Sequence, residues 1–209
     1  MIRIIIVDDH PIVRRGLKQI LLDQPDMEVV GEAENAQEAF KTIHTTDCDV
    51  VVLDISLPGA SGVEILKQLK YEYVKLPVLI LSVHSEEQYA VRVMKAGASG
   101  YLKKDSAPEE LVKAIRKIIS GRKYVSTTLA EILIADMETA ERPLHENLSD
   151  REFQIMLMIA KGQALKTIAE ELHLSEKTIS VYRTRLLKKM KMHNNVEIAN
   201  YALKNKFID

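Results

Sequence analysis

Cysteine is almost absent from this chain, which contains a single Cys among 209 residues. An internal disulfide is therefore excluded, and the one thiol fits a reducing compartment. No apolar run is long enough to cross a bilayer, and the N-terminus lacks the charged and then apolar layout of a signal peptide. Internal repeats and low-complexity tracts are also missing. We therefore expect an ordinary globular, cytoplasmic protein.

Length and charge indicate two modules. A chain of 209 residues has room for one large domain or two ordinary ones. The net charge of -1 hides an uneven distribution, because residues 147–209 hold eleven Lys and Arg against seven Asp and Glu. That segment carries about +4, which leaves about -5 for residues 1–146. The split suggests an acidic module followed by a basic one.

Short apolar runs alternate with segments of helical periodicity over residues 1–121, the first predicted domain. Strands are expected at residues 2–7, 27–31, 50–54, 77–82 and 100–104. Helices are expected at residues 11–25, 36–44, from 62, at 86–96 and at 108–120. Buried strands that alternate with helices predict an α/β fold, a flavodoxin-like doubly wound five-stranded parallel sheet with right-handed crossovers.

Residues 122–146 are predicted to be a linker that contains one helix. Ser126 or Thr127 can cap this helix, which is expected over 129–139 and has an apolar stripe without a partner in its own unit. A polar run follows and ends in Pro143, a helix breaker.

Residues 147–209 show helical periodicity throughout, so a small all-α four-helix domain is expected. Ser149 and Glu152 form a capping box for its first helix. A short helix over 165–172, a tight turn and a longer basic helix over about 176–191 follow. This succession inside a four-helix unit is typical of a helix-turn-helix domain.

Polar side chains stand at the carboxyl ends of four predicted strands. Asp8 and Asp9 follow the first strand, Asp54 ends the third, and Ser82 and Lys104 end the fourth and fifth. Ligands bind beyond these ends in open α/β sheets, so the five side chains are expected in one crevice. Three close carboxylates favour a hard divalent cation, and oxygen ligands favour Mg²⁺.

With the metal present, Asp54 can act as a nucleophile toward a phosphoryl group, while Lys104 and Ser82 hold the transferred oxygens. The alternative is that Asp8 and Asp9 only cap the next helix and that Asp54 is a turn residue before Leu57-Pro58-Gly59. Neither His10 nor His84 has companions at metal-ligand spacing, so no zinc site is predicted.

The longer basic helix is amphipathic. With Ile179 facing inward, Leu186 and Met190 fall within about 20° of it and form a core stripe. The opposite face mixes donors, a methyl group and cations, as a helix in the major groove requires. These residues are Lys177, Ser180, Val181, Thr184 and Lys188. Candidates for phosphate contacts are Arg183, Arg185 and Lys189 at its flanks and Lys161 and Lys166 before it. A solvated amphipathic helix is the alternative.

The motifs Val7-Asp8-Asp9-His10, residues 53–59, Leu81-Ser82-Val83-His84 and residues 97–104 resemble receiver domains of bacterial two-component systems. The resemblance covers about residues 2–121. It implies that Asp54 accepts phosphate from a histidine kinase or a small phosphodonor. It also implies that Asp9, Asp54 and the Ser56 carbonyl ligate Mg²⁺, with Asp8 helping largely through water.

Further roles come from the same resemblance. Lys104, three residues after Tyr101, matches the family's invariant lysine. Ser82 and Tyr101 match the switch pair, in which the hydroxyl moves toward the phosphate and the ring follows inward. Ser56 and His84 occupy positions that tune hydrolysis of the phosphoryl group in the family.

Residues 148–152, 160–162, 168–172 and 174–179 resemble the LuxR-type helix-turn-helix. Together the two modules are similar to NarL/FixJ-class response regulators, and residues 154–163 with Tyr182-Arg183 are close to the GacA/UvrY branch. The resemblance implies a transcription factor, not an enzyme, in which phosphorylation controls homodimerisation and binding to promoter DNA. The last helix, with Val196 and Tyr201, contributes either to dimerisation or to core packing.

Two other functions stay open. A metal-dependent phosphohydrolase with an aspartyl-phosphate intermediate usually carries a second acid two residues after the nucleophile, where this chain has Ser56. A protein-binding regulator whose helical module no longer contacts DNA is the other. Steep salt dependence of binding to promoter DNA would exclude it.

Overall fold

Aliphatic, largely β-branched runs form the strands of a parallel sheet in this computed structural model, which describes residues 1–57, 61–138 and 143–208. The strands are β1 (Ile2–Val7), β2 (Met27–Ala33), β3 (Val50–Asp54), β4 (Val78–Ser82) and β5 (Gly100–Lys103). Their order is β2-β1-β3-β4-β5, and every pair is parallel. β3 and β4 are buried at all positions, as strands of a sheet covered on both faces are. The predicted doubly wound fold is confirmed.

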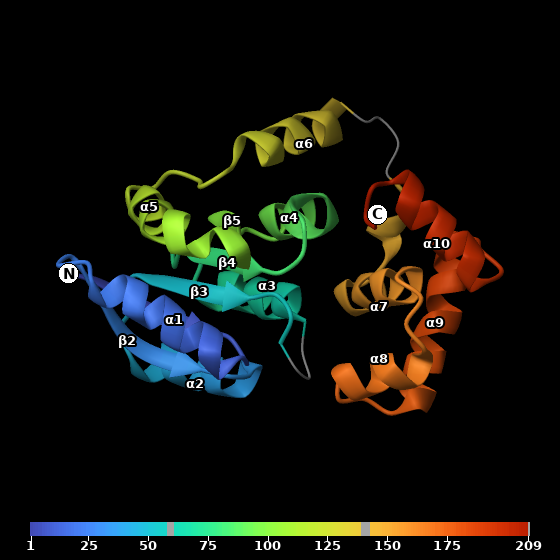
Figure 1. The fold of residues 1–209 in the computed structure, drawn as a ribbon, viewed down its shortest axis with the longest axis horizontal. Coiled ribbons are helices and arrows are strands. Elements are labelled where there is room, and N and C mark those ends of the chain that lie inside the picture. Colours follow the sequence, from blue (N-terminus) through green and yellow to red (C-terminus); the bar gives the residue numbers. More distant parts are fainter. Residues whose placement is uncertain (58–60, 139–142, 209) are drawn as a thin grey trace. The chain divides into compact units, whose positions relative to one another are not determined.

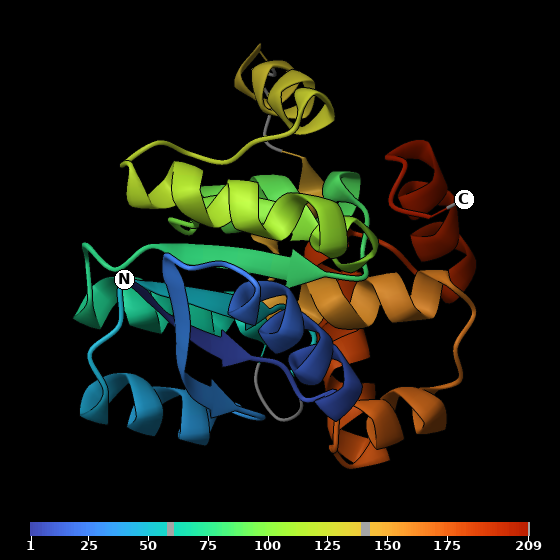
Figure 2. The same ribbon diagram turned by 60° about the vertical axis from the view of Figure 1, so that its left-hand side comes forward.

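Helices cover both faces of this sheet (Figures 1 and 2). They are α1 (Pro11–Leu22), α2 (Ala36–Thr45), α3 (Gly62–Glu72), α4 (Glu86–Lys95) and α5 (Ala107–Ile119). α1 and α5 share one face, where Leu17 and Leu111 belong to one apolar core with Ile4, Val52 and Leu79 of the strands. α2, α3 and α4 lie on the other face.

Most predicted elements are found, with small shifts at their ends. β2 runs two residues beyond the prediction because Val7 of β1 pairs with Ala33. β5 ends at Lys103, and Lys104 begins a short 3-10 helix, η1 (Lys104–Ser106), instead of ending the strand. α6 (Thr127–Glu138) begins two residues before the prediction, with Ser126 accepting a hydrogen bond from the Leu129 amide at 3.0 Å.

Some predictions fall on residues that the structure does not describe. These are the turn at Pro58-Gly59, the end of the linker helix at Thr139, the polar run over 139–142 and the C-terminal Asp209. The chain divides into two compact units, Met1–Leu133 and Ile134–Asp209. The predicted domain boundaries at residues 121 and 147 stay predictions.

The second unit is helical. Its elements are η2 (Leu144–Asn147), a 3-10 helix, and α7 (Asp150–Ala160), α8 (Leu165–Glu171), α9 (Glu176–Met190) and α10 (Asn195–Lys204). The capping box of Ser149 and Glu152 at the start of α7 is confirmed. The turn between α8 and α9 passes through His173, whose φ of 51° is left-handed. The predicted helix-turn-helix arrangement is therefore present.

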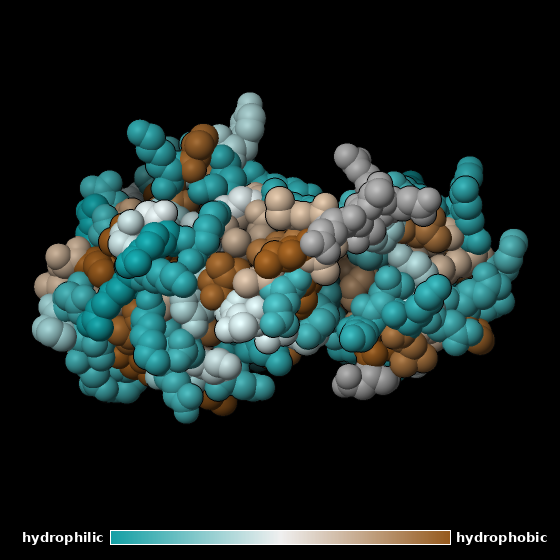
Figure 3. All heavy atoms as spheres, turned by 90° about the horizontal axis from the view of Figure 1, so that it is seen from above, coloured by the Kyte–Doolittle hydropathy of each residue, from teal (hydrophilic) through white to brown (hydrophobic). Residues whose placement is uncertain are grey.

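The surface is mostly hydrophilic on the face drawn in Figure 3, with hydrophobic side chains in groups between the polar ones. Within the described ranges, the structure contains no helix whose length and apolar character would suffice to cross a membrane.

Candidate functional site

The register of the strands brings four predicted side chains to one edge of the sheet. β1 and β3 are in register at their ends, so Asp8 lies level with Asp54. β4 and β5 also end side by side, which puts Ser82 beside the last residue of β5, and Lys104 follows directly. The strand order reverses between β1 and β3, and ligands bind at such a switch point in open α/β sheets.

The ammonium group of Lys104 joins two buried carboxylates at this edge. Its Nζ lies 2.7 Å from Asp8 Oδ2 and 2.8 Å from Asp54 Oδ2, and both aspartates are 1% exposed. Burial raises the pKa of the Asp54 carboxyl, and Asp8 adds to this, although Lys104 acts in the opposite sense. Burial would lower the pKa of Lys104, but the two carboxylates outweigh it and raise that pKa. Lys104 therefore stays a cation between two acids.

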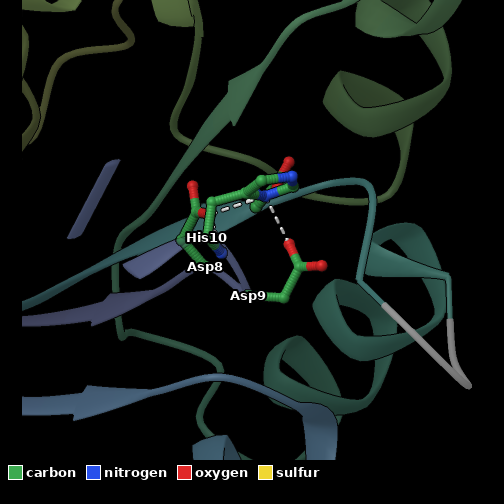
Figure 4. Close-up of side chains that lie close together, drawn as sticks. Asp8, Asp9 and His10 are labelled. Atoms are coloured by element: carbon green, nitrogen blue, oxygen red, sulfur yellow. Dashed lines mark hydrogen bonds and ion pairs between the residues drawn. The ribbon is translucent and has the colours of Figure 1, made fainter. Parts of the chain in front are cut away.

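Asp9 and His10 complete the acidic cluster (Figure 4). The imidazole Nδ1 of His10 lies 2.7 Å from Asp9 Oδ1 and 3.3 Å from Asp8 Oδ1. One ligand atom from each of Asp8, Asp9, His10 and Asp54 lies within 4.8 Å of the others, close enough to surround one metal ion. The prediction that His10 lacks companions is therefore wrong. The turn after β1 brings its ring back over the carboxylates, and its place directly after two aspartates was a signal for this.

Asp8 combines the two roles that the sequence left as alternatives. Its Oδ1 accepts a hydrogen bond from the His10 amide at 2.8 Å, a local turn contact at the start of α1. Its other oxygen binds Lys104 across the sheet. The capping explanation is thus incomplete, since the carboxylate also belongs to the cluster.

A hydrogen-bonded network extends from Asp54 to the loop after β4. The Ser56 amide donates to Asp54 Oδ1 at 3.0 Å, and Ser56 Oγ lies 3.2 Å from His84 Nε2. The His84 amide donates to Ser82 Oγ at 3.0 Å, and Tyr101 Oη donates to the His84 carbonyl at 2.9 Å. The Tyr101 ring is fully buried, and burial raises its pKa. Its ring thus already faces inward here.

The outward face of α9 carries the predicted nucleic-acid contacts. Ile179, Leu186 and Met190 are at most 1% exposed, so the predicted core stripe is confirmed. The residues predicted for base contacts on the opposite side are exposed. One shallow hollow is lined by five of the predicted contact residues, namely Lys177, Ser180, Val181, Thr184 and Arg185. Lys188, farther along α9, and Lys166, on α8, are also exposed.

Two of the flanking cations have partners within the second unit. Arg183 Nε donates to Asn195 Oδ1 at 2.7 Å, which links α9 to the start of α10. Lys189 Nζ donates to Glu152 Oε2 at 2.6 Å. Burial would raise the pKa of Glu152, but Lys189 and Ser149 outweigh it and lower that pKa. These two cations therefore stabilise the helical packing, a role that helical spacing alone did not reveal.

Two known protein families match this chain, one in each part. Residues 4–116 match the response regulator receiver domain, and residues 146–202 match the bacterial regulatory proteins of the luxR family. The chain belongs to the response regulators. The predicted receiver followed by a LuxR-type helix-turn-helix is thus confirmed, and the match of residues 146–202 makes this response regulator a transcription factor rather than an enzyme.

Similar proteins align over nearly the whole response regulator. It is 40% identical over 208 residues to the response regulator UvrY of Escherichia coli, covering 98% of this chain and 95% of UvrY. It is 34% identical over 213 positions to the response regulator GacA of Pseudomonas aeruginosa, covering 100% of this chain and 99% of GacA. The predicted similarity to the GacA/UvrY branch is confirmed.

Solved structures of RcsB share the fold. One, from Salmonella enterica serovar Typhimurium, is bound to promoter rprA in the presence of the phosphomimetic BeF3-, with a TM-score of 0.67 and 27% identity over 96% of this chain and 97% of RcsB. Another contains two RcsB dimers bound to two parallel DNAs, with a TM-score of 0.61 and 27% identity over 98% of each chain. The acidic cluster of this response regulator is consistent with the metal site of a receiver.

Proposed function

We propose that Asp54 accepts a phosphoryl group from a histidine kinase or a small phosphodonor, and that this controls dimerisation and DNA binding. The observation that carries the proposal is the buried Asp54 carboxylate, held between the Ser56 amide and the Lys104 ammonium beside two further aspartates. The hydrogen bond and the ion pair orient the Asp54 carboxylate, and the Lys104 ammonium can stabilise the negative charge of the incoming phosphoryl group.

The chemical step is a transfer between two nucleophiles. One oxygen of the Asp54 carboxylate attacks the phosphorus of a phosphohistidine, and a P–O bond forms. The P–N bond to the imidazole breaks with its electron pair moving to nitrogen, which then takes up a proton. Lys104 holds an oxygen of the transferred group, and Ser82 turns its hydroxyl toward it.

Mg²⁺ is the ion that this donor set fits. Its ligands would be Asp9, Asp54 and the Ser56 carbonyl, with Asp8 acting largely through water. The support is that three of the four side chains in the cluster, Asp8, Asp9 and Asp54, offer carboxylate oxygens, the ligands that Mg²⁺ prefers. When bound, the ion neutralises charge on the phosphoryl oxygens.

The output is binding of α9 to the major groove of promoter DNA by a homodimer in the cytoplasm. Base edges and thymine methyl groups would be read by exposed residues of its outer face, and phosphates by cations around it. The proposed contact residues are Lys177, Ser180, Val181, Thr184, Arg185, Lys188, Arg183 and Lys166. The support is the shallow hollow that five of them line and the DNA-bound dimers of RcsB.

Replacement of Asp54 tests the proposal. The Asp54→Asn chain should take up at least about 100-fold less label from a radioactive acyl phosphate than the natural chain, because an amide is not a nucleophile at this step. Chelation of divalent cations with EDTA should abolish labelling of the natural chain as well. Asp47→Asn is the matched control, since that side chain is 91% exposed and paired with Arg3. Normal labelling of Asp54→Asn would refute the proposal.

A further inference from the structure

The segment between α5 and α6 (Figure 1) contacts β5 and α5 before the linker helix begins. The Tyr124 amide donates to the Ser99 carbonyl at 2.9 Å, and Tyr124 forms a parallel bridge with Gly100 of β5. The phenol of Tyr124 donates to Glu110 of α5 at 2.7 Å. The segment thus lies as an extra extended piece along the edge of the sheet.

A glycine makes this close approach possible. A Cβ at Gly100 would lie 2.8 Å from the Tyr124 Cβ and 2.9 Å from the Tyr124 carbonyl oxygen, which is closer than real Cβ contacts. The position of the segment is therefore defined by backbone packing. The chain is therefore held against β5 and α5 at Tyr124, just before α6 begins.

Ser126 joins two helices through one hydroxyl. Its Oγ accepts the amide hydrogen of Leu129 at 3.0 Å and so caps α6. The same hydroxyl donates to the carboxylate of Glu86, with Oε1 at 2.8 Å and Oε2 at 2.7 Å. Glu86 is the first residue of α4. The N-cap of the linker helix is thus bonded to the first turn of α4.

The start of α4 follows directly on the network around Asp54. Tyr101 Oη lies 2.9 Å from the His84 carbonyl and 3.3 Å from the Ser85 carbonyl, and the next residue is Glu86. The His84 amide is bound to Ser82 Oγ. We therefore expect a rotation of the Ser82 hydroxyl to break that bond and to shift the loop that leads to Glu86.

We propose that the hydrogen bond between Ser126 and Glu86 transmits the state of Asp54 to the linker helix. The proposal rests on the proposed phosphorylation of Asp54. In the present structure the Ser126 hydroxyl binds Glu86 and the Leu129 amide at ordinary hydrogen-bond lengths. A displacement of Glu86 therefore lengthens the hydrogen bond between Glu86 and Ser126. Loss of this bond frees the hydroxyl to rotate and loosens the first turn of α6.

The receiver and the helical unit are joined covalently by this helix, because the division between the two compact units falls within α6. The contact of Tyr124 with Glu110 anchors the same segment to α5, which does not follow the Ser82 loop. Two glutamates can therefore be compared. Glu86 binds Ser126 and is proposed to transmit the state of Asp54, whereas Glu110 holds Tyr124 against α5.

Amide hydrogen exchange of the full-length protein, with and without Mg²⁺ and BeF3-, tests the proposal. In the natural chain, activation should speed exchange of the Leu129 and Ala130 amides by about fivefold, the effect of a weakened N-cap. In Glu86→Ala these amides should exchange at the faster rate in both states. Glu110→Ala and Ser126→Thr, which keep the link, should respond like the natural chain.

Affinity for a DNA duplex provides the second readout. BeF3- should change the DNA affinity of Glu86→Ala by less than about twofold. It should change the affinity of Glu110→Ala by the same factor as that of the natural chain. If Glu86→Ala responds to BeF3- as the natural chain does in both readouts, the proposal is overturned. It is also overturned if exchange of the Leu129 amide is unchanged in a natural chain whose Ser56 and Ser82 amides show that BeF3- is bound. If those amides do not respond and Asp54 takes up no phosphoryl label, the proposed function itself fails, and this inference falls with it.

Discussion

The side chain of His84 makes contacts on two sides, next to the hydrogen-bonded network around Asp54. Its Nε2 lies 3.2 Å from Ser56 Oγ, and its ring packs against Tyr89 with 4.9 Å between centroids. Both contacts orient the imidazole beside a residue whose amide binds Asp54. If Asp54 carries a phosphoryl group as proposed, we expect a fixed ring at this place to limit the access of water to it.

Replacement of His84 by Ala should therefore shorten the lifetime of the phosphoryl group. A hydrogen bond of this kind contributes about 1 kcal/mol, which corresponds to about fivefold in rate. The measurement is the decay of radioactive label from the phosphorylated full-length chain. His44→Ala is a suitable control, because His44 is exposed on α2 and bonded to Tyr73. An unchanged decay rate in His84→Ala would contradict this reasoning.

Among the helices, α1 contains a glycine that its packing does not require. Gly16 lies inside α1, and a Cβ added there would meet no atom within 4 Å. Glycine in a helix interior is less favourable than alanine by about 1 kcal/mol, because its unfolded backbone is more flexible. Gly62, at the start of α3, differs, since a Cβ there would lie 2.5 Å from the Ile55 Cα.

Gly16→Ala should accordingly stabilise the receiver by about 1 kcal/mol, whereas Gly62→Ala should destabilise it. The check is urea unfolding of the full-length variants, followed by the transition of the first unit. The two substitutions are chemically identical, so they separate helix propensity from steric fit. Equal shifts of the two midpoints would show that the packing around Gly62 is not tight.

The helix caps show how much of the structure local sequence predicts. Asn35 accepts a hydrogen bond from the Glu38 amide at 2.9 Å, and Ser149 forms the expected capping box with Glu152. The capping box of Ser149 was predicted, and local sequence allows both caps to be predicted, because a cap and its partner are three residues apart in any chain. Lys104 illustrates the opposite case, since a turn of 3-10 helix replaced the end of the predicted strand.

Over the whole molecule, charge is divided between an acidic first part and a basic second part. The exposed cations of α9 and α8 belong to the basic part, and each one that binds a phosphate should release counterions. Affinity for double-stranded DNA should therefore fall steeply as the salt concentration rises. This behaviour would also exclude a helical module that no longer contacts DNA.

Lys188→Ala should weaken binding to a DNA duplex and reduce the slope of log affinity against log salt by about 0.9, the contribution of one phosphate contact. Fluorescence anisotropy at several salt concentrations measures both quantities. Lys204→Ala, an exposed lysine at the end of α10, removes the same charge outside the proposed face and should leave the slope unchanged. Equal slopes for all three chains would remove Lys188 from the proposed contacts.

The fold class, the strand-end carboxylates and the inward stripe of α9 could all be predicted from the order of residues along the chain. Each depends on residues that are close in the chain or repeat at the period of a helix or strand. Asp54 is the clearest case, because a buried β-branched run ends at that carboxylate.

The pairing of charged and polar groups that are far apart in the chain became visible only in the folded protein. Lys104 joins Asp54, 50 residues away in the chain, and also reaches Asp8. Lys189 joins Glu152, and Ser126 joins Glu86. Such pairs depend on strand register and helix packing, which bring distant residues within 3 Å and leave no trace in local spacing.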